Sequence, residues 1–144
     1  MTEACIDPTR SAFEAFKALP RDEPLAMLNL VRFRDRAEYE AGHALAGAGL
    51  TGAEAYANYG RDSAPVFSKV GGAIAWRGDF RCVLIGPEDE AWDEVFVASY
   101  PTASSFLAMV TDPVYQQAVK HRQAAVATSR LIRCAPAEAG AVFG

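Results

Sequence analysis

The apolar stretch LAMLNLV (residues 25–31) decides the fold of this chain. Pro24 precedes it and the charged stretch 32–36 follows it. A bounded apolar run of this length predicts a β-strand that is buried on both faces. Its one polar residue is Asn29, whose amide either faces a cavity or belongs to a hydrogen-bonded core.

Helices are predicted both before and after this strand in the sequence. Thr51 and Glu54 have the spacing of a capping box, so a helix is expected to begin at Gly52. Gly60 and Pro65 lie inside it and are expected to bend it. The predicted helices are 9–19, 52–70, 102–110 and 113–127.

Three further strands are predicted. The stretch 73–85 is apolar at both ends, and Gly78 inside it favours one long strand bent at this glycine over a hairpin. In that strand Cys82 is expected to be a small buried apolar residue. The remaining two strands are 94–100 and 129–134.

This order, β-α-β twice after a leading helix, predicts an α+β fold of the ferredoxin-like, split βαβ type. Its four-stranded antiparallel sheet carries the helices on one face. Leu28 and Leu30 point to one side of the first strand, and Met27 and Val31 point to the other. The face without helices is therefore apolar, and a second copy of the chain is its expected cover, which predicts a homodimer through the open sheet face.

The chain length of 144 residues is that of one domain. We expect an N-terminal helical extension over residues 1–23, the ferredoxin-like α/β-barrel domain over 24–134 and a flexible tail over 135–144. The segment 33–50 is a long connection, and connections of this length are often functional or mobile.

Composition and charge exclude several classes of protein. The formal net charge of −4 argues against a sequence-independent nucleic-acid binder. The sequence has neither a signal-peptide pattern nor an apolar window near the ~18 residues of a membrane span, so a cytoplasmic protein without a membrane partner is expected. The three cysteines are widely spaced, which favours neither a disulfide framework nor a zinc site.

Arg122 is the most informative candidate site residue. It falls inside the apolar stripe of the last predicted helix, with Tyr115, Ala118 and Val119. A guanidinium on a core-facing stripe needs an anionic partner or strong hydrogen-bond acceptors. It therefore either holds the anionic group of a ligand, forms a structural ion pair, or extends along the helix edge to solvent.

Aromatic and histidine side chains complete the candidate site. Tyr56 and Tyr59, one helical turn apart, and Trp76 could line a pocket or fill the core. His121 could serve as a general base or be a partly exposed surface residue. With His43 as the other histidine and no paired carboxylate spacing, a metal site is not expected. The predicted ligand-binding set is Asn29, Tyr56, Tyr59, Trp76, His121 and Arg122.

Several short motifs, in this order and spacing, resemble the family catalogued as domain of unknown function 1330. The resemblance covers residues 24–132 and implies a dimeric α/β barrel, in which two ferredoxin-like subunits pack sheet to sheet. The wider superfamily includes cofactor-free monooxygenases, lactone isomerases, haem-dependent dismutases and stress-response proteins. The motifs are Met27-Leu28-Asn29-Leu30 with Arg32-Phe33, Ala55-Tyr56 with Tyr59, Gly71-Gly72, Asp93-Glu94 before Tyr100-Pro101, Asp112-Pro113 with Tyr115, and His121-Arg122.

Two functions are compatible with these residues. The first is binding of a small aromatic or enolisable anion in a cleft between helices and sheet, with cofactor-free oxygenation or isomerisation as the chemistry. The second is a ligand-binding or stress-associated dimer without catalysis. A haem or flavin carrier is a third and less favoured alternative, so no cofactor is expected.

Overall fold

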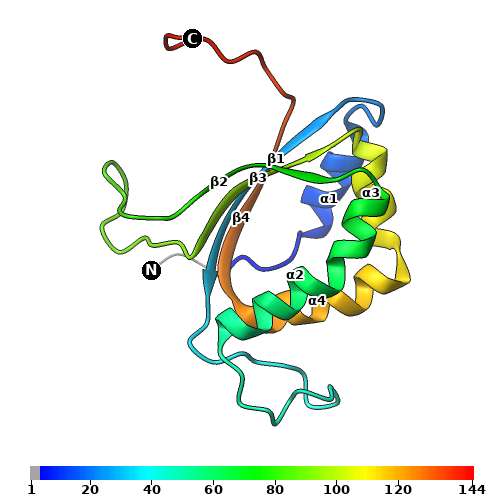
Figure 1. Cartoon of the computed structure of the whole chain (residues 1–144), viewed down its shortest axis with the longest axis vertical. Coiled ribbons are helices and arrows are strands. Elements are labelled where there is room, and N and C mark those ends of the chain that lie inside the picture. Colours follow the sequence, from blue (N-terminus) through cyan, green and yellow to red (C-terminus); the bar gives the residue numbers. More distant parts are fainter. Residues whose placement is uncertain (1–3) are drawn as a thin grey trace.

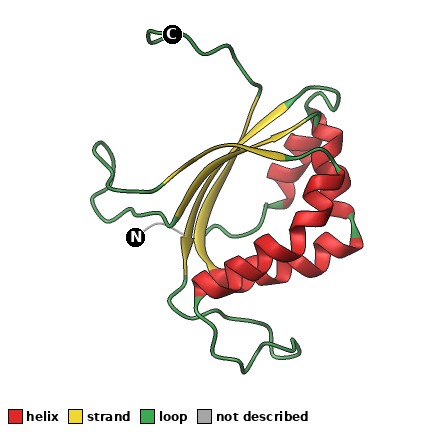
Figure 2. Cartoon of the chain, in the orientation of Figure 1, coloured by secondary structure: helices red, strands yellow, loops and turns green. Residues whose placement is uncertain are grey.

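The structure is a computed structural model that describes residues 4–144. Within these residues a four-stranded antiparallel sheet has the strand order β2-β3-β1-β4, and the helices all lie on one side of it (Figures 1 and 2). This is the predicted α+β, ferredoxin-like fold. The elements are α1 (Arg10–Ala18), β1 (Leu25–Phe33), α2 (Gly52–Lys69), β2 (Ala73–Gly78), β3 (Glu94–Tyr100), α3 (Ala103–Thr111), α4 (Pro113–Ala125) and β4 (Val126–Cys134).

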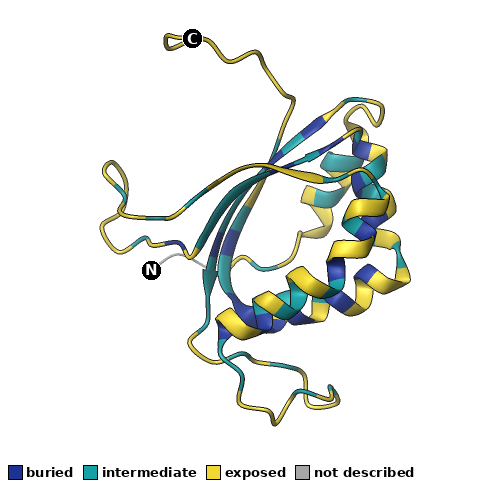
Figure 3. Cartoon of the chain, in the orientation of Figure 1, coloured by how far each residue is buried: buried dark blue, intermediate teal, exposed yellow. Residues whose placement is uncertain are grey.

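The predicted strand over residues 25–31 is the centre of the sheet. β1 pairs with β3 on one side and β4 on the other, both antiparallel. Leu25, Met27 and Val31 are buried against the helices, whereas Leu28 and Leu30 on the opposite face keep part of their surface exposed. Figure 3 shows the buried positions gathered where helices face the sheet. The strand is therefore buried on one face by this chain, and its apolar second face is open.

The open face continues across neighbouring strands. The register places Val97 opposite Leu28 and Val95 opposite Leu30, and Ile132 of β4 is also opposite Leu28. Ile132 is 45% exposed although it is apolar. Apolar side chains of all four strands thus share this face: Ala26, Leu28, Leu30, Trp76, Val95, Val97 and Ile132.

Two predictions about β2 are wrong. The strand ends at Gly78, and residues 79–93 form a loop in place of the predicted continuation to residue 85. The register explains the ending: Gly78 is opposite Val95 near the start of β3, so later residues have no strand to pair with. Leu84 and Ile85 are 89% and 94% exposed, and Cys82 is exposed rather than buried.

The prediction that Trp76 faces the same way as Ile74 is wrong, because a β-bulge lies between them. Ile74 pairs with Ala98 on the helix-facing side, but after the irregularity Trp76 pairs with Val97 on the open side. One additional residue in a strand reverses the direction of every later side chain. Trp76 is therefore 56% exposed on the open face and neither fills the core nor faces the helices.

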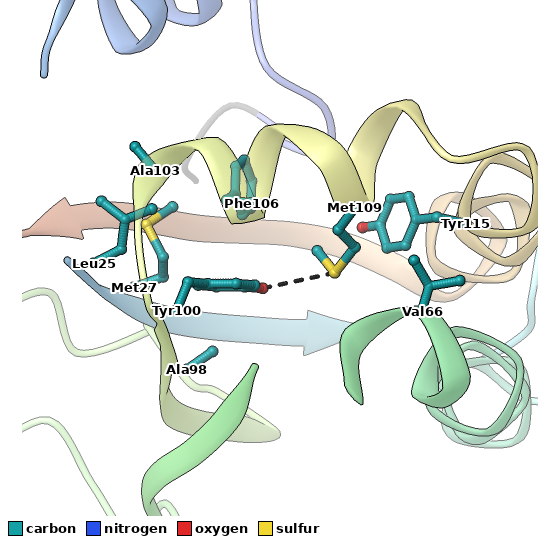
Figure 4. Close-up of a cluster of buried hydrophobic side chains, with 9 residues drawn as sticks. All are labelled: Leu25, Met27, Val66, Ala98, Tyr100, Ala103, Phe106, Met109 and Tyr115. Atoms are coloured by element: carbon teal, nitrogen blue, oxygen red, sulfur yellow. Dashed lines mark hydrogen bonds between the residues drawn. The ribbon is translucent and has the colours of Figure 1, made fainter. Parts of the chain in front are cut away.

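Within residues 4–144 the core between sheet and helices consists of two clusters. The larger one joins Met27 and Tyr100 of the sheet to Val66, Met109 and Tyr115 of the helices (Figure 4). Phe16 of α1 packs against it, with its ring 5.2 Å from that of Phe106. The smaller cluster joins Val31, Ala55, Ala125 and Val126.

The segment 34–50 is attached to the helical layer. The backbone N–H of Arg34 donates to Ala125 O at 2.8 Å, and that of Glu38 donates to Ala124 O at 2.9 Å. At its end Thr51 and Glu54 form the predicted capping box, which begins α2. α2 continues through Gly60 and Pro65, and its axis changes direction along its length in Figure 1, as predicted.

The last ten residues add no helix or strand. Residues 135–144 have no regular secondary structure and extend away from the sheet (Figure 1), while residues 1–3 lie outside the described part. No helix in residues 4–144 has both the length and the hydropathy to cross a bilayer.

The Asp112 carboxylate is expected to make stability depend on pH. It accepts from the backbone N–H of Val114 and from Lys69 Nζ, both at 2.8 Å, and these bonds hold its pKa below the ordinary value of 3.8. A lowered pKa in the folded state stabilises the fold above the unfolded-state pKa, and this stabilisation is lost as pH falls through the folded-state value. Asp112→Ala should therefore lower the unfolding midpoint in urea at pH 7.

A pH series checks the cause. The difference between Asp112→Ala and the unmodified chain should shrink below pH 4, where the carboxyl becomes protonated. Asp112→Asn is the matched variant, because its side-chain oxygen can still cap α4 but carries no charge. A difference that stays constant between pH 7 and pH 3 would contradict the electrostatic explanation.

Candidate functional site

Asn29 lies on the helix-facing side of the central strand. It falls between Met27 and Val31, which are 3% and 0% exposed, yet Asn29 itself keeps partial exposure. Its Nδ2 donates to Met27 O at 3.0 Å, and no bond to its Oδ1 is present within residues 4–144.

Three tyrosines of α2 and α4 contact one another in the helical layer. The hydroxyls of Tyr59 and Tyr115 lie 2.8 Å apart, and the Tyr56 ring is 5.4 Å from that of Tyr59. Tyr59 packs against the larger core cluster and Tyr56 against the smaller one, so the pair spans the boundary between them. Burial raises the pKa of each of the three hydroxyls above 10. At neutral pH they are protonated hydrogen-bond donors.

Arg122 is half-buried beside these tyrosines. Its positive charge lowers the pKa of Tyr56, Tyr59 and Tyr115, an effect smaller than that of burial. Its Nη1 donates to Ile6 O at 2.6 Å and its Nη2 to Ser129 Oγ at 3.1 Å. Both acceptors are neutral, and no carboxylate of residues 4–144 pairs with this guanidinium.

The tyrosines and Arg122 thus supply one cation and several neutral donors. Glu94 and Arg77, joined at 3.1 Å, lie close enough to influence the Tyr56 pKa and add a charged pair at one side. The sequence did not indicate either of these two residues as a site residue, although Glu94 belongs to one of the family motifs. Their sequence neighbours carry no such signal, because only the pairing of β2 with β3 places Arg77 and Glu94 near Tyr56.

Three of the six predicted site residues lie close together here, namely Tyr56, Tyr59 and Arg122, and Asn29 is on the helix-facing side of the sheet. Trp76 does not lie with them, because the bulge turns it to the open face. His121 lies on another face of α4 and is buried, not partly exposed as the alternative interpretation expected. Its ring contacts Tyr39 and Asp62, which the sequence did not indicate as site residues. No cluster of three metal-ligating side chains occurs in the described part of the chain.

The family model described as domain of unknown function, DUF1330, matches residues 41–133. The chain belongs to this family. The matched region contains the three tyrosines and Arg122 but begins after Asn29. No curated protein matches the sequence.

This DUF1330 chain is similar to RPA0582, a protein of unknown function from Rhodopseudomonas palustris. One crystal structure of RPA0582 is 53% identical, with 95% of this chain and 100% of that chain covered and a TM-score of 0.87. The methylated RPA0582 structure has the same identity, coverage of 96% and 99%, and a TM-score of 0.89. These values support the fold over nearly its full length.

A more distant similarity links the chain to a dimeric protein of unknown function with a ferredoxin-like fold from Bacteroides fragilis. Its identity is 10%, it covers 81% of this chain and 99% of that one, and its TM-score is 0.47. At this distance it supports no statement about function or assembly.

Proposed function

We propose that this DUF1330 protein binds a small aromatic or enolisable anion between the sheet and α2 and α4. The observation that carries the proposal is Arg122, a half-buried cation that has only neutral acceptors among the described residues. A charged group removed from water is stabilised most by an opposite charge. A carboxylate or enolate bound between Arg122 and the tyrosines would provide this opposite charge.

The other side chains fit the remainder of such a ligand. Tyr56 supplies an aromatic surface, and Asn29 retains a free amide oxygen for a donor on the ligand. One of the Tyr59 and Tyr115 hydroxyls donates to the other, and the proton of the accepting hydroxyl is suited to an anionic oxygen. Because their raised pKa keeps them protonated, the cluster favours binding over proton abstraction by a tyrosinate.

Arg122→Gln tests the anion site. We expect binding of benzoate, salicylate or phenylpyruvate, measured by calorimetry, to weaken about 30-fold, the equivalent of ~2 kcal/mol for a charge-assisted hydrogen bond. Arg10→Gln is the matched control, because Arg10 is exposed on α1 and outside the cluster. The affinity of the Arg10→Gln variant for these anions should equal that of the unmodified chain.

A second variant separates binding from stability, because Arg122 also anchors the N-terminal segment. Asn29→Ala leaves both Arg122 bonds in place and should still reduce affinity for the same anions. Unfolding in urea without ligand is measured in parallel. If none of the three anions binds the unmodified chain, or if Asn29→Ala binds equally well, the proposed function is wrong.

The proposal includes a homodimer through the open sheet face. The support is the set of apolar side chains that the register aligns there and that this chain leaves exposed, Trp76 and Ile132 among them. A contiguous apolar patch of this kind marks an association surface in soluble proteins. A second copy would cover it sheet to sheet.

A further inference from the structure

His121 is the centre of a second polar cluster. Its side chain is buried, with 10% of its surface exposed. Nδ1 lies 2.6 Å from the Tyr39 hydroxyl, and Nε2 lies 3.1 Å from Asp62 Oδ2. These three groups come from the segment 34–50, α4 and α2, so the tertiary fold alone assembles them.

The hydrogen bonds fix the direction of the protons. An ionised carboxylate only accepts, so Asp62 assigns the ring proton of neutral His121 to Nε2. The lone pair of Nδ1 then accepts the proton of the Tyr39 hydroxyl. The hydroxyl of Tyr39 thus faces the unprotonated nitrogen of His121, and the carboxylate of Asp62 orients the imidazole from its other side.

Tyr39 is held in place by its surroundings. Its ring stacks on His43 with centroids 4.5 Å apart, and His43 meets His121 edge to face at 5.6 Å. The preceding residue, Glu38, is tied to α4 by its backbone bond to Ala124. The hydroxyl therefore reaches His121 from a fixed backbone and a fixed ring plane.

A pocket of about 580 Å³ opens beside this cluster, between α2, α4 and the segment 34–50. Its polar lining residues are His43, Arg61, Asp62, Gln117 and His121, and its apolar ones are Pro65, Val114 and Ala118. Tyr39 is not a lining residue and adjoins the pocket through its ring stack on His43. A small molecule with an apolar body and one polar reacting group fits this lining. Arg122 is not among the residues that line this pocket, although Ala118, one helical turn before it on α4, is.

We propose that Tyr39, His121 and Asp62 form a nucleophile–base–acid triad that accepts acyl groups from small esters. This arrangement, a hydroxyl within hydrogen-bond reach of a base that a third group orients, is the general signature of an activated nucleophile. Burial raises the pKa of Tyr39, so its hydroxyl is protonated at rest and needs His121 to take its proton during attack.

The chemistry balances without a cofactor. Tyr39 Oη forms a bond to the ester carbonyl carbon as its proton moves to Nδ1 of His121. The bond to the leaving alkoxide breaks, and the alkoxide takes the proton back from His121. Water then attacks the acyl-tyrosine ester with His121 again as base, which releases a carboxylic acid and restores Tyr39.

The test uses 4-nitrophenyl acetate and the full chain. We expect a burst of nitrophenolate and an acetyl group located on Tyr39 by peptide mass spectrometry. Tyr39→Phe keeps the ring stacked on His43 and removes only the hydroxyl, so the acetyl group at this position and the burst should both be lost. Tyr100→Phe is the matched control, because Tyr100 lies in the core, where its hydroxyl meets Met109 Sδ at 3.9 Å.

The base and the orienting group are tested separately. His121→Gln should slow acetylation of Tyr39 about 100-fold, the size of a general-base contribution. If that variant does not fold, Asp62→Asn still tests the proposal, and a slowing of at least tenfold is expected. The exposed cysteines Cys5, Cys82 and Cys134 are replaced by serine in all variants, since exposed thiols also attack this ester.

Three outcomes would overturn the proposal. One is acetylation located elsewhere with none on Tyr39. Another is a burst that survives in Tyr39→Phe. The third is an unchanged acetylation rate in Asp62→Asn, which would show that the three side chains only attach the segment 34–50 to the helices.

Discussion

Replacing Gly52 by alanine is expected to destabilise the fold by about 3 kcal/mol, because the first residue of α2 has no room for a methyl group. A Cβ there would lie 2.0 Å from Arg34 O, 2.9 Å from Arg34 N and 3.0 Å from Ala125 O. All three are backbone atoms, and the same two residues are joined by a hydrogen bond of 2.8 Å. No side-chain rotation can relieve the clash.

Gly60→Ala is the matched control, since Gly60 lies in the same helix and a Cβ there meets nothing within 4 Å. That variant should be more stable than the unmodified chain by about 1 kcal/mol, because alanine favours a helix over glycine. Urea unfolding of both variants measures the difference. Equal stabilities would mean that the ends of β1, α2 and α4 do not meet as closely as described.

The Val97→Lys variant is expected to be a monomer under conditions in which the unmodified chain is a dimer. Val97 is on a central strand of the open face, opposite both Leu28 and Trp76. In a single chain the new ammonium would remain in solvent and the fold should be kept. Between two packed sheets it would be buried without a partner, which costs several kcal/mol.

Native mass spectrometry measures this effect directly. Val142→Lys makes the same chemical change in the exposed C-terminal residues and should leave the mass at twice that of the chain. If the unmodified chain is a monomer at micromolar concentration, the open face has no second copy as its cover. If Val97→Lys stays dimeric, the dimer uses another surface.

Local patterns predicted the elements well. The capping box of Thr51 and Glu54 and the Asp112-Pro113 start of α4 are present as expected, because a helix terminus is specified by residues three or four positions apart. The apolar run over residues 25–31 became the central strand. These signals depend on sequence neighbours alone.

The errors concern register and partners. A bulge between Ile74 and Trp76 has no signature in this sequence, so the face of Trp76 could not be predicted. The run Val83-Leu84-Ile85 has strand composition but no strand to pair with. The composition of a segment shows whether it can form a strand. Whether it does so depends on a neighbouring strand with which it can pair.

The candidate sites show the same limit. The stripe of α4 correctly indicated that Arg122 faces inward, but its acceptors Ile6 and Ser129 come from the N-terminal segment and β4. Tyr39 and Asp62 lie 82 and 59 residues from His121. Residues this far apart in the sequence produce no periodic pattern, so these contacts can be identified only in the folded chain.

The bond between Arg122 and Ile6 places two binding equilibria in competition. An anion that takes the Nη1 proton now donated to Ile6 displaces that carbonyl, while Ser129 still holds the Cys5 carbonyl next to it. The affinity for the anion is then reduced by the free energy of releasing this part of the N-terminal segment, and by thermodynamic linkage the segment is loosened to the same extent when the anion binds. The N-terminal segment would in this way act as an internal competitor that sets the concentration range over which the protein responds to its ligand.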